Sequence, residues 1–206
     1  MNKALETYSI EYTGIFKMDT CYFYKYFATN GLKFETIGQT LDSCRKLRDK
    51  WLRKQSVSFT GHRHISADPK ILSSKIEDKI IDTYNQGMRF FYVGGAIGFD
   101  TLAAEAVLSV KKQYTDIVLV VVVPFEGQDS LFSMSAKEQY AKILVQADDV
   151  ITLSNHYFKS CYLHRNDFLI SHSSLLISYW EEKSTGGTSY TVRQALKKKI
   201  MVHNLY

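Results

Sequence analysis

The chain has 206 residues, of which 45% are hydrophobic and 14% aromatic, a composition typical of a folded protein with a sizeable core. No apolar run approaches the ~18 residues of a membrane span, the first residues do not resemble a signal peptide, and three widely spaced cysteines argue against a disulfide framework. The net charge of +5 is concentrated at one end, because residues 1–55 hold ten Lys and Arg against six Asp and Glu. We therefore expect a cytoplasmic protein with a basic N-terminal segment.

Residues 1–55 predict a small ββα appendage. The runs YSIEYTGIFK and CYFYKYFA predict two strands of a hairpin that turns at Met18-Asp19-Thr20. The stretch TLDSCRKLRDKWLRK then predicts a helix with Thr40 or Asp42 as its N-cap.

Two interpretations of this basic appendage stay open. In the first, aromatic side chains of CYFYKYF and basic residues of the helix bind single-stranded nucleic acid. The candidate contacts are Arg45, Lys46, Arg48, Arg53 and Lys54. In the second, one aromatic face packs on Leu41, Leu47 and Trp51 of the helix, and the charges form an ordinary solvated face. A net charge of +4 over 55 residues is modest for a nucleic-acid module.

From residue 56 to residue 206, short β-rich runs alternate with helical stretches. The predicted strands are SVSFTG, FFYVGG, DIVLVVVVP, DVITLS, SLLISYW and IMVHNL, and a helical pattern follows each of the first five. VLVVVV is apolar throughout, as expected of a strand covered by helices on both faces. The segment predicts an α/β domain with a doubly wound, mainly parallel sheet of about six strands and a ligand crevice at their carboxyl ends.

The first of two glycine-rich turns follows the strand FFYV. Gly94, Gly95 and Gly98, with Ala96 between them, leave the backbone open to a ligand. The helix that starts near Asp100 offers unpaired N–H groups and a positive dipole end, which favour an anion such as phosphate. The alternative is a tight turn without a ligand, in which Asp100 only caps the helix.

The second turn follows LLISYW and opens the last predicted helix. Gly186, Gly187, Thr188 and Ser189 could form another anion cradle there. Two such turns at the ends of strands predict one two-sided pocket.

Other candidate ligand residues lie near these turns. Gly61, His62 and Arg63 end the first strand of the predicted sheet. Arg165 offers a planar fork of donors that fits phosphate, and Asn166 beside it could read a base or ribose edge. The alternative for Arg165 is a surface salt bridge.

Aromatic residues and histidines add weaker signals. Trp180, Tyr157 and Tyr162 could stack on a base, although aromatic residues at sheet ends are more often packed in the core. His62 and His64 have an HxH spacing but no third ligand in a supporting pattern, so we expect no metal site.

Six motifs stand out along the chain: TGHR (60–63), GGAIGFDTLAAE (94–105), VVPFEGQ (122–128), ADDVITLS (147–154), RNDFLISHSSLLISYW (165–180) and GGTSYTVRQA (186–195). Their order resembles that of the SLOG superfamily, and the chain is most similar to its YpsA-like branch, also called DUF1273. The resemblance covers about residues 56–206. It implies a Rossmann-like fold that binds nucleotides or nucleotide-derived ligands between the two glycine turns, and a homodimer or larger assembly.

The superfamily includes the Lonely-guy phosphoribohydrolases, which act on nucleoside monophosphates with an arginine and a glutamate. Arg165 matches that arginine. The glutamate position is occupied by Thr191, whose hydroxyl cannot replace a carboxylate as a general base. We keep Thr191 among the candidate ligand residues and assign no confident catalytic residue; Arg165 would be the one if the protein were an enzyme.

The residues and the resemblance together predict a ligand-binding or sensor protein without turnover. Its ligand would be a nucleotide or a nucleotide-derived, phosphate-containing small molecule, with no cofactor required and no membrane partner. The alternatives are a phosphoribohydrolase of the Lonely-guy type and a single-stranded nucleic-acid-binding protein that uses the appendage. The DNA-processing protein A family, which belongs to the same superfamily, supports the nucleic-acid alternative by association.

Overall fold

The computed structural model describes residues 4–12 and 20–206. The chain divides into two compact units, residues 1–54 and residues 55–206. Among the described residues, no helix is both long enough and apolar enough to cross a membrane.

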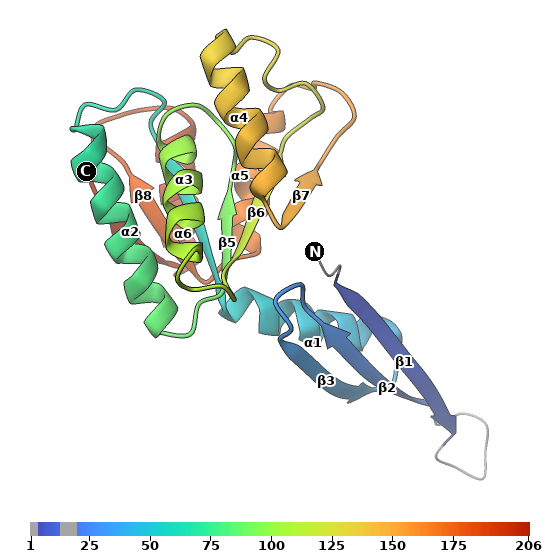
Figure 1. The fold of residues 1–206 in the computed structure, drawn as a ribbon. Helices are drawn as coiled ribbons and strands as arrows, with labels where there is room; N and C mark the ends of the chain where they lie inside the picture. Colours follow the sequence, from blue (N-terminus) through green and yellow to red (C-terminus); the bar gives the residue numbers. More distant parts are fainter. Residues whose placement is uncertain (1–3, 13–19) are drawn as a thin grey trace. The chain divides into compact units, whose positions relative to one another are not determined.

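The N-terminal unit is a three-stranded antiparallel sheet followed by one helix (Figure 1). Its elements are β1 (Leu5–Tyr12), β2 (Thr20–Phe27), β3 (Lys33–Gly38) and α1 (Leu41–Lys54), with β2 in the centre of the sheet. The predicted turn at Met18-Asp19-Thr20 lies, apart from Thr20, outside the described residues.

The third strand corrects the predicted ββα order. KFETIG in β3 alternates between exposed and half-buried residues and pairs with β2 from Lys33 to Gly38. The turn before it contains Asn30 and Gly31, and Gly31 has a positive φ of 85°. An Asn-Gly pair between two alternating runs is a strong hairpin signal, so the sequence carried the information needed to predict this strand.

Thr40, rather than Asp42, caps α1. The Thr40 hydroxyl accepts a hydrogen bond from the Ser43 backbone N–H at 3.1 Å, and the Ser43 hydroxyl accepts one from the Thr40 N–H at 3.3 Å. This reciprocal pair satisfies two backbone donors at the start of the helix. Asp42 instead forms an ion pair with Lys46 one turn later, at 2.7 Å.

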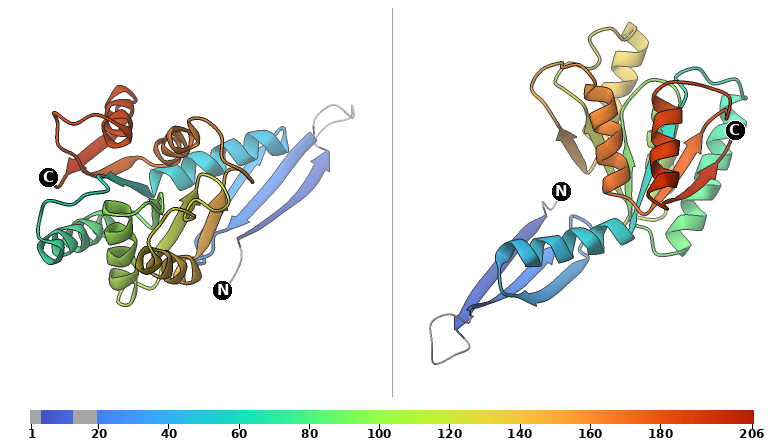
Figure 2. Two further views of the ribbon diagram at one scale, coloured as in Figure 1. Left: turned by 90° about the horizontal axis from the view of Figure 1, so that it is seen from above. Right: turned by 180° about the vertical axis from the view of Figure 1, so that it is seen from behind.

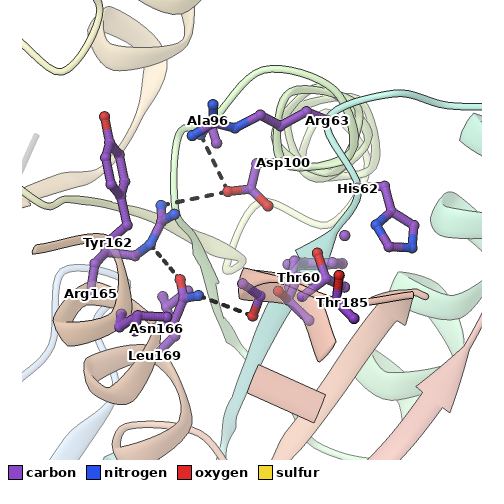
Figure 3. A pocket seen from close by; sticks show the side chains of 15 residues that line it. Thr60, His62, Arg63, Ala96, Asp100, Tyr162, Arg165, Asn166, Leu169 and Thr185 are labelled. Atoms are coloured by element: carbon purple, nitrogen blue, oxygen red, sulfur yellow. Dashed lines mark hydrogen bonds and ion pairs between the residues drawn. The ribbon is translucent and has the colours of Figure 1, made fainter. Parts of the chain in front are cut away.

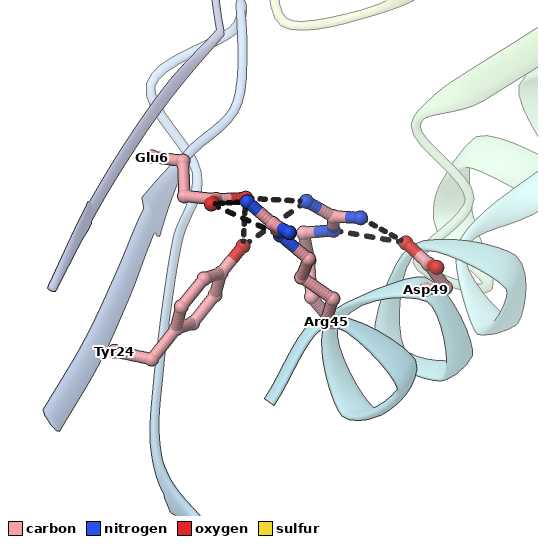
Figure 4. Close-up of polar contacts among 5 residues, drawn as sticks. Glu6, Tyr24, Arg45 and Asp49 are labelled. Carbon is pink, nitrogen blue, oxygen red and sulfur yellow. Dashed lines mark hydrogen bonds and ion pairs between the residues drawn. The ribbon is translucent and has the colours of Figure 1, made fainter. Parts of the chain in front are cut away.

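A half-buried cluster of ion pairs around Glu6 joins the sheet of this unit to its helix (Figure 4). Glu6 in β1 accepts hydrogen bonds from Arg45 at 2.6 Å, from Arg48 at 2.9 Å and from the Tyr24 hydroxyl at 3.0 Å. Arg48 also reaches Asp49, at 2.7 Å. Two of the arginines that the sequence nominates for nucleic-acid contacts are therefore engaged by acidic side chains within the unit.

The C-terminal unit has a six-stranded parallel sheet in the order β7-β6-β5-β4-β8-β9. Its strands are β4 (Ser56–Gly61), β5 (Phe90–Val93), β6 (Val118–Val123), β7 (Asp149–Thr152), β8 (Leu175–Tyr179) and β9 (Met201–Asn204). Its helices are α2 (Pro69–Asn85), α3 (Phe99–Lys111), α4 (Met134–Gln146), α5 (Cys161–Ser171) and α6 (Gly187–Lys197). The predicted doubly wound α/β fold is confirmed.

Helices cover both faces of this sheet. The group α2, α3 and α4 lies on the face toward the viewer in Figure 1, whereas α5 and α6 lie on the opposite face, seen from behind in Figure 2. All six residues of β6, VLVVVV, are accordingly buried. The larger core lies under α2 and α3 and includes Phe59, Phe91 and Phe99, each fully buried.

The strand order reverses at β4, which has β5 on one side and β8 on the other. In open α/β sheets, a crevice forms outside the carboxyl ends of the strands at such a switch point. The loops after β4, β5 and β8 therefore meet at one place, where the motifs at residues 60–63, 94–105 and 186–195 also lie.

We expect the N-terminal unit to lose stability at alkaline pH through Tyr24. Burial, and then the hydrogen bond to Glu6, raises the pKa of Tyr24 from 10.0 to about 12. A raised pKa means that the folded state holds the proton more tightly, so this stabilisation is complete below pH 10 and is lost as the pH rises through about 12. The measurement is urea unfolding at a series of pH values, followed by Trp51 fluorescence in a Trp180→Phe background.

Tyr24→Phe should remove this alkaline loss, whereas Tyr8→Phe, a change at a side chain that is 50% exposed, should keep it. An identical pH dependence in the Tyr24→Phe variant and the parent would contradict the assignment.

We also expect Gly61→Ala to destabilise the C-terminal unit. A Cβ at Gly61 would lie 2.4 Å from the Cβ of Phe99, a buried side chain that cannot move away freely. Overpacking of this kind costs about 1–3 kcal/mol. Gly187→Ala is the matched control, because its new methyl group would meet Asn166 at an ordinary 3.6 Å. Equal melting temperatures for the two variants would refute the prediction.

Candidate ligand-binding site

A cavity of about 370 Å³ lies at the carboxyl ends of the strands, where the loops after β4, β5 and β8 meet helix α5 (Figure 3). Ten of the residues predicted from the sequence line it: Gly61, His62, Arg63, Ala96, Asp100, Tyr162, Arg165, Asn166, Gly187 and Thr188. The segments that carry these residues are separated by up to about three fifths of the chain. Only the fold brings them together.

Arg165 and Asp100 form a buried ion pair in one wall of the cavity. The guanidinium Nη1 lies 3.6 Å from a carboxylate oxygen of Asp100, and both residues are 6% exposed. Burial raises the pKa of the Asp100 carboxyl and lowers that of the Arg165 guanidinium, while the charge of each partner works in the opposite direction. The predicted alternative of a surface salt bridge for Arg165 does not describe this buried pair.

Further hydrogen bonds fix both members of this pair. The Asp100 carboxylate accepts the Ala96 N–H at 3.2 Å, and the Arg165 Nε donates to the Asn166 side chain at 2.9 Å. Arg165 Nη1 also donates to the Gly94 carbonyl. The loop after β5 and helix α5 are thereby linked through one guanidinium.

Gly94 provides the space that this guanidinium occupies. A Cβ at Gly94 would lie 1.7 Å from Nη1 of Arg165 and 2.6 Å from the Asp100 carboxylate. Gly94 is buried and does not line the cavity. Its lack of a side chain therefore serves the ion pair rather than a direct contact with a ligand.

The second glycine turn presents free backbone donors. No hydrogen bond is made by the N–H groups of Gly187, Thr188 and Ser189 within the described residues, and the N-cap Gly186 has no side chain to supply one. The first turn of a helix is a favourable place for an anion when its N–H groups lack partners. Gly187 and Thr188 belong to the cavity wall, so an anion in the cavity is within their reach.

Arg63 lies at the mouth of the cavity, and its side chain is exposed. Its guanidinium is placed over the ring of Tyr162, 5.6 Å from the ring centre, and forms no ion pair with an acidic side chain of the described residues. This cation is therefore available to a ligand, unlike Arg165.

His62 has a structural partner. Its Nε2 accepts the Glu181 N–H at 3.1 Å, and its ring packs edge-on against Tyr179. The imidazole therefore holds the loop after β8 in place at the side of the cavity. The described residues contain no group of three or more His, Cys, Asp or Glu side chains that could hold a metal ion.

The remaining predicted residues lie behind the cavity lining. Trp180 donates its indole N–H to the Ser189 hydroxyl at 3.0 Å, and the Thr191 hydroxyl donates to the Gly187 carbonyl at 2.8 Å. Gly98 has a positive φ of 85°, and the Arg63 backbone packs where its Cβ would be. These contacts shape the two turns from outside. Gly95 does the same, with a φ of 65° and the Gln128 side chain against it.

Sequence reasoning missed two polar lining residues, Thr60 and Thr185. Thr60 belongs to the TGHR motif and Thr185 directly precedes Gly186 in the second turn, so the position of each residue in the sequence carried a signal. Among the described residues, Asp100 is the only lining residue with a carboxylate. The cavity therefore offers donors and cations for an anion, with a single carboxylate that is already paired.

Comparison with known proteins assigns the chain to a family. The YpsA family model, described as the YspA SLOG family, matches residues 59–204, so the chain belongs to this family. UPF0398 protein YpsA of Bacillus subtilis is 26% identical over 130 residues, which cover 62% of this chain and 72% of that protein. A UPF0398 protein of Bacillus cereus is 29% identical over 129 residues, covering 62% and 70% of the two chains.

Two solved structures of DNA processing protein A share the fold. The Streptococcus pneumoniae protein aligns with a TM-score of 0.54 at 21% identity, covering 74% of this chain and 50% of that one, so the present chain spans half the length of this relative. The Helicobacter pylori protein, described for its single-stranded DNA binding mode, aligns with a TM-score of 0.54 at 18% identity and coverages of 75% and 67%. At these identities the likeness concerns the fold alone.

Proposed function

We propose that this member of the YpsA SLOG family binds a nucleotide or a nucleotide-derived, phosphate-containing small molecule in the cavity between the two glycine turns, and acts as a ligand-binding or sensor protein without turnover. The observation that carries the proposal is that Arg63 and the N–H groups of Gly187 and Thr188 surround one cavity and have no acidic or hydrogen-bonding partner, respectively, in the part of the chain that the structure describes. Both kinds of group stabilise phosphate.

The size and chemistry of the cavity support a small ligand. About 370 Å³ lies within the usual range for sites that hold cofactors and small molecules. Thr60, Thr185 and Asn166 add hydroxyl and amide groups of the kind that hydrogen-bond to a ribose. The carboxylate of Asp100 is suited to accept a ribose hydroxyl beside its existing bond to Ala96.

The residues give less support to hydrolysis. Thr191, at the position of the Lonely-guy glutamate, is fully buried and donates its hydroxyl to Gly187 within its own helix. Asp100 is held by Arg165, which makes it a poor candidate for a carboxylate that stabilises positive charge on a sugar.

Nucleic-acid binding through the N-terminal unit is also less well supported. Arg45, Lys46 and Arg48 each form an ion pair with an acidic side chain of that unit. Phosphate contacts would have to compete with these pairs, so the small-molecule function is the one we put forward. The homodimer or larger assembly implied by the resemblance stays a prediction.

Arg63→Ala tests the proposal directly. It should weaken the binding of a nucleoside monophosphate by roughly 10- to 100-fold, since a charge-assisted hydrogen bond contributes about 1.5–3 kcal/mol. Isothermal titration calorimetry measures the affinity, and Arg193→Ala, at an exposed arginine of α6 outside the cavity, is the matched control. Arg165→Ala is a poorer probe, because it would leave Asp100 buried without a partner. Equal affinities of the Arg63→Ala variant and the parent protein for the nucleotide would contradict the proposed site.

A second test addresses turnover. Prolonged incubation of adenosine 5′-monophosphate with a high concentration of the protein should return the nucleotide intact, because no free carboxylate faces the cavity from the described residues. Chromatography of the mixture detects released adenine, and a sample without protein gives the background. Protein-dependent release of the base would restore the phosphoribohydrolase alternative.

A further inference from the structure

A second cavity of about 420 Å³ adjoins the first in the same unit. The two share Arg63, Ala96 and Tyr162, which Figure 3 shows at one side of the first cavity. The second cavity differs from the first in chemistry, because aromatic and aliphatic side chains supply most of its wall.

The aromatic rings form a cluster around Phe125, in the loop between β6 and α4. The ring of Phe125 meets the ring of Tyr157 edge-on at 5.4 Å and the ring of Tyr162 edge-on at 5.8 Å. Tyr157 is 65% exposed, and Leu131 on the same wall is 96% exposed. Covering such exposed apolar surface with a flat apolar group lowers the free energy of the complex, because both surfaces leave water.

Gln128 adds one oriented polar group to this wall. Its amide nitrogen donates to the Gly95 carbonyl at 3.2 Å and contacts the Tyr140 hydroxyl at 2.8 Å. A carbonyl oxygen can only accept, so the contact with Gly95 fixes which end of the amide is nitrogen. The other end, Oε1, takes no hydrogen bond from the described residues. An acceptor of fixed direction is therefore available beside an aromatic cavity.

We propose that this second cavity binds the base of the nucleotide, with an exocyclic amino group of the base donating to Gln128 Oε1. The inference rests on the proposed function, in which the phosphate lies in the first cavity. Arg63 lines both cavities, so in this arrangement it lies between the phosphate and the base of one ligand. The ligand class is a nucleotide with an amino-bearing base such as adenine, rather than a sugar phosphate alone.

Three probes separate the contributions of the phosphate, the base and the amino group. Adenosine 5′-monophosphate should bind most tightly. Inosine 5′-monophosphate, which places a carbonyl oxygen opposite Oε1, should bind about tenfold more weakly. Ribose 5-phosphate, which has no base, should bind more weakly still, because stacking of a base on aromatic side chains is lost.

One pair of variants tests the cavity wall by calorimetry with the same probes. Tyr157→Ala should weaken the binding of adenosine 5′-monophosphate about tenfold and leave that of ribose 5-phosphate unchanged, since only the base contacts the ring. Phe158→Ala is the matched control, because Phe158 is the next residue, is 41% exposed and packs on His164 outside both cavities.

The outcomes distinguish this inference from the proposed function. Equal binding of adenosine 5′-monophosphate and ribose 5-phosphate, or no effect of Tyr157→Ala, overturns the base site and leaves the phosphate site standing. Equal binding of the adenosine and inosine nucleotides overturns the role of Gln128. Failure of all three probes to bind overturns both proposals.

Discussion

The buried pair of Arg165 and Asp100 is the interaction on which the candidate site depends. It joins the first turn of α3 to helix α5, and the same guanidinium also bonds to the Gly94 carbonyl in the loop after β5. Removing one partner of such a pair leaves an uncompensated charge and costs about 3–5 kcal/mol. A side chain at position 94 would collide with the guanidinium of Arg165. The pair therefore explains why this position of the glycine motif is a glycine.

The two arginines of the site differ in role, because only Arg165 belongs to the buried pair. Arg165 carries its charge in the protein interior and orients Asn166, whereas Arg63 stands at the mouth of the cavity without an acidic partner among the described residues. A ligand phosphate would therefore meet an exposed cation that can turn toward it, next to a wall whose own arginine is held by Asp100, Gly94 and Asn166. The backbone N–H groups of Gly187 and Thr188 are already fixed by the start of α6, so only the Arg63 side chain would lose conformational freedom when an anion binds.

The sequence predicted the fold well where a pattern of residues can arise from only one structural environment. The uniformly apolar VLVVVV indicates a strand covered on both faces, and all six of its residues are buried. Site prediction was less complete, because local patterns do not report long-range packing. The glycine at 94 suggested a ligand cradle, but its neighbour is a guanidinium from a residue far along the chain, and Trp180 turns its N–H to Ser189. Thr60 and Thr185 could be identified as lining residues only from the fold, which brings the loops together.

The most direct test of the central claim is an amide NMR titration with adenosine 5′-monophosphate. If the crevice between the two glycine turns is the ligand site, the backbone N–H resonances of Gly187, Thr188 and Ala96 should shift saturably and yield one common dissociation constant. The account would be contradicted if these resonances stayed unmoved while the nucleotide bound, or if the shifts were confined to residues 1–54.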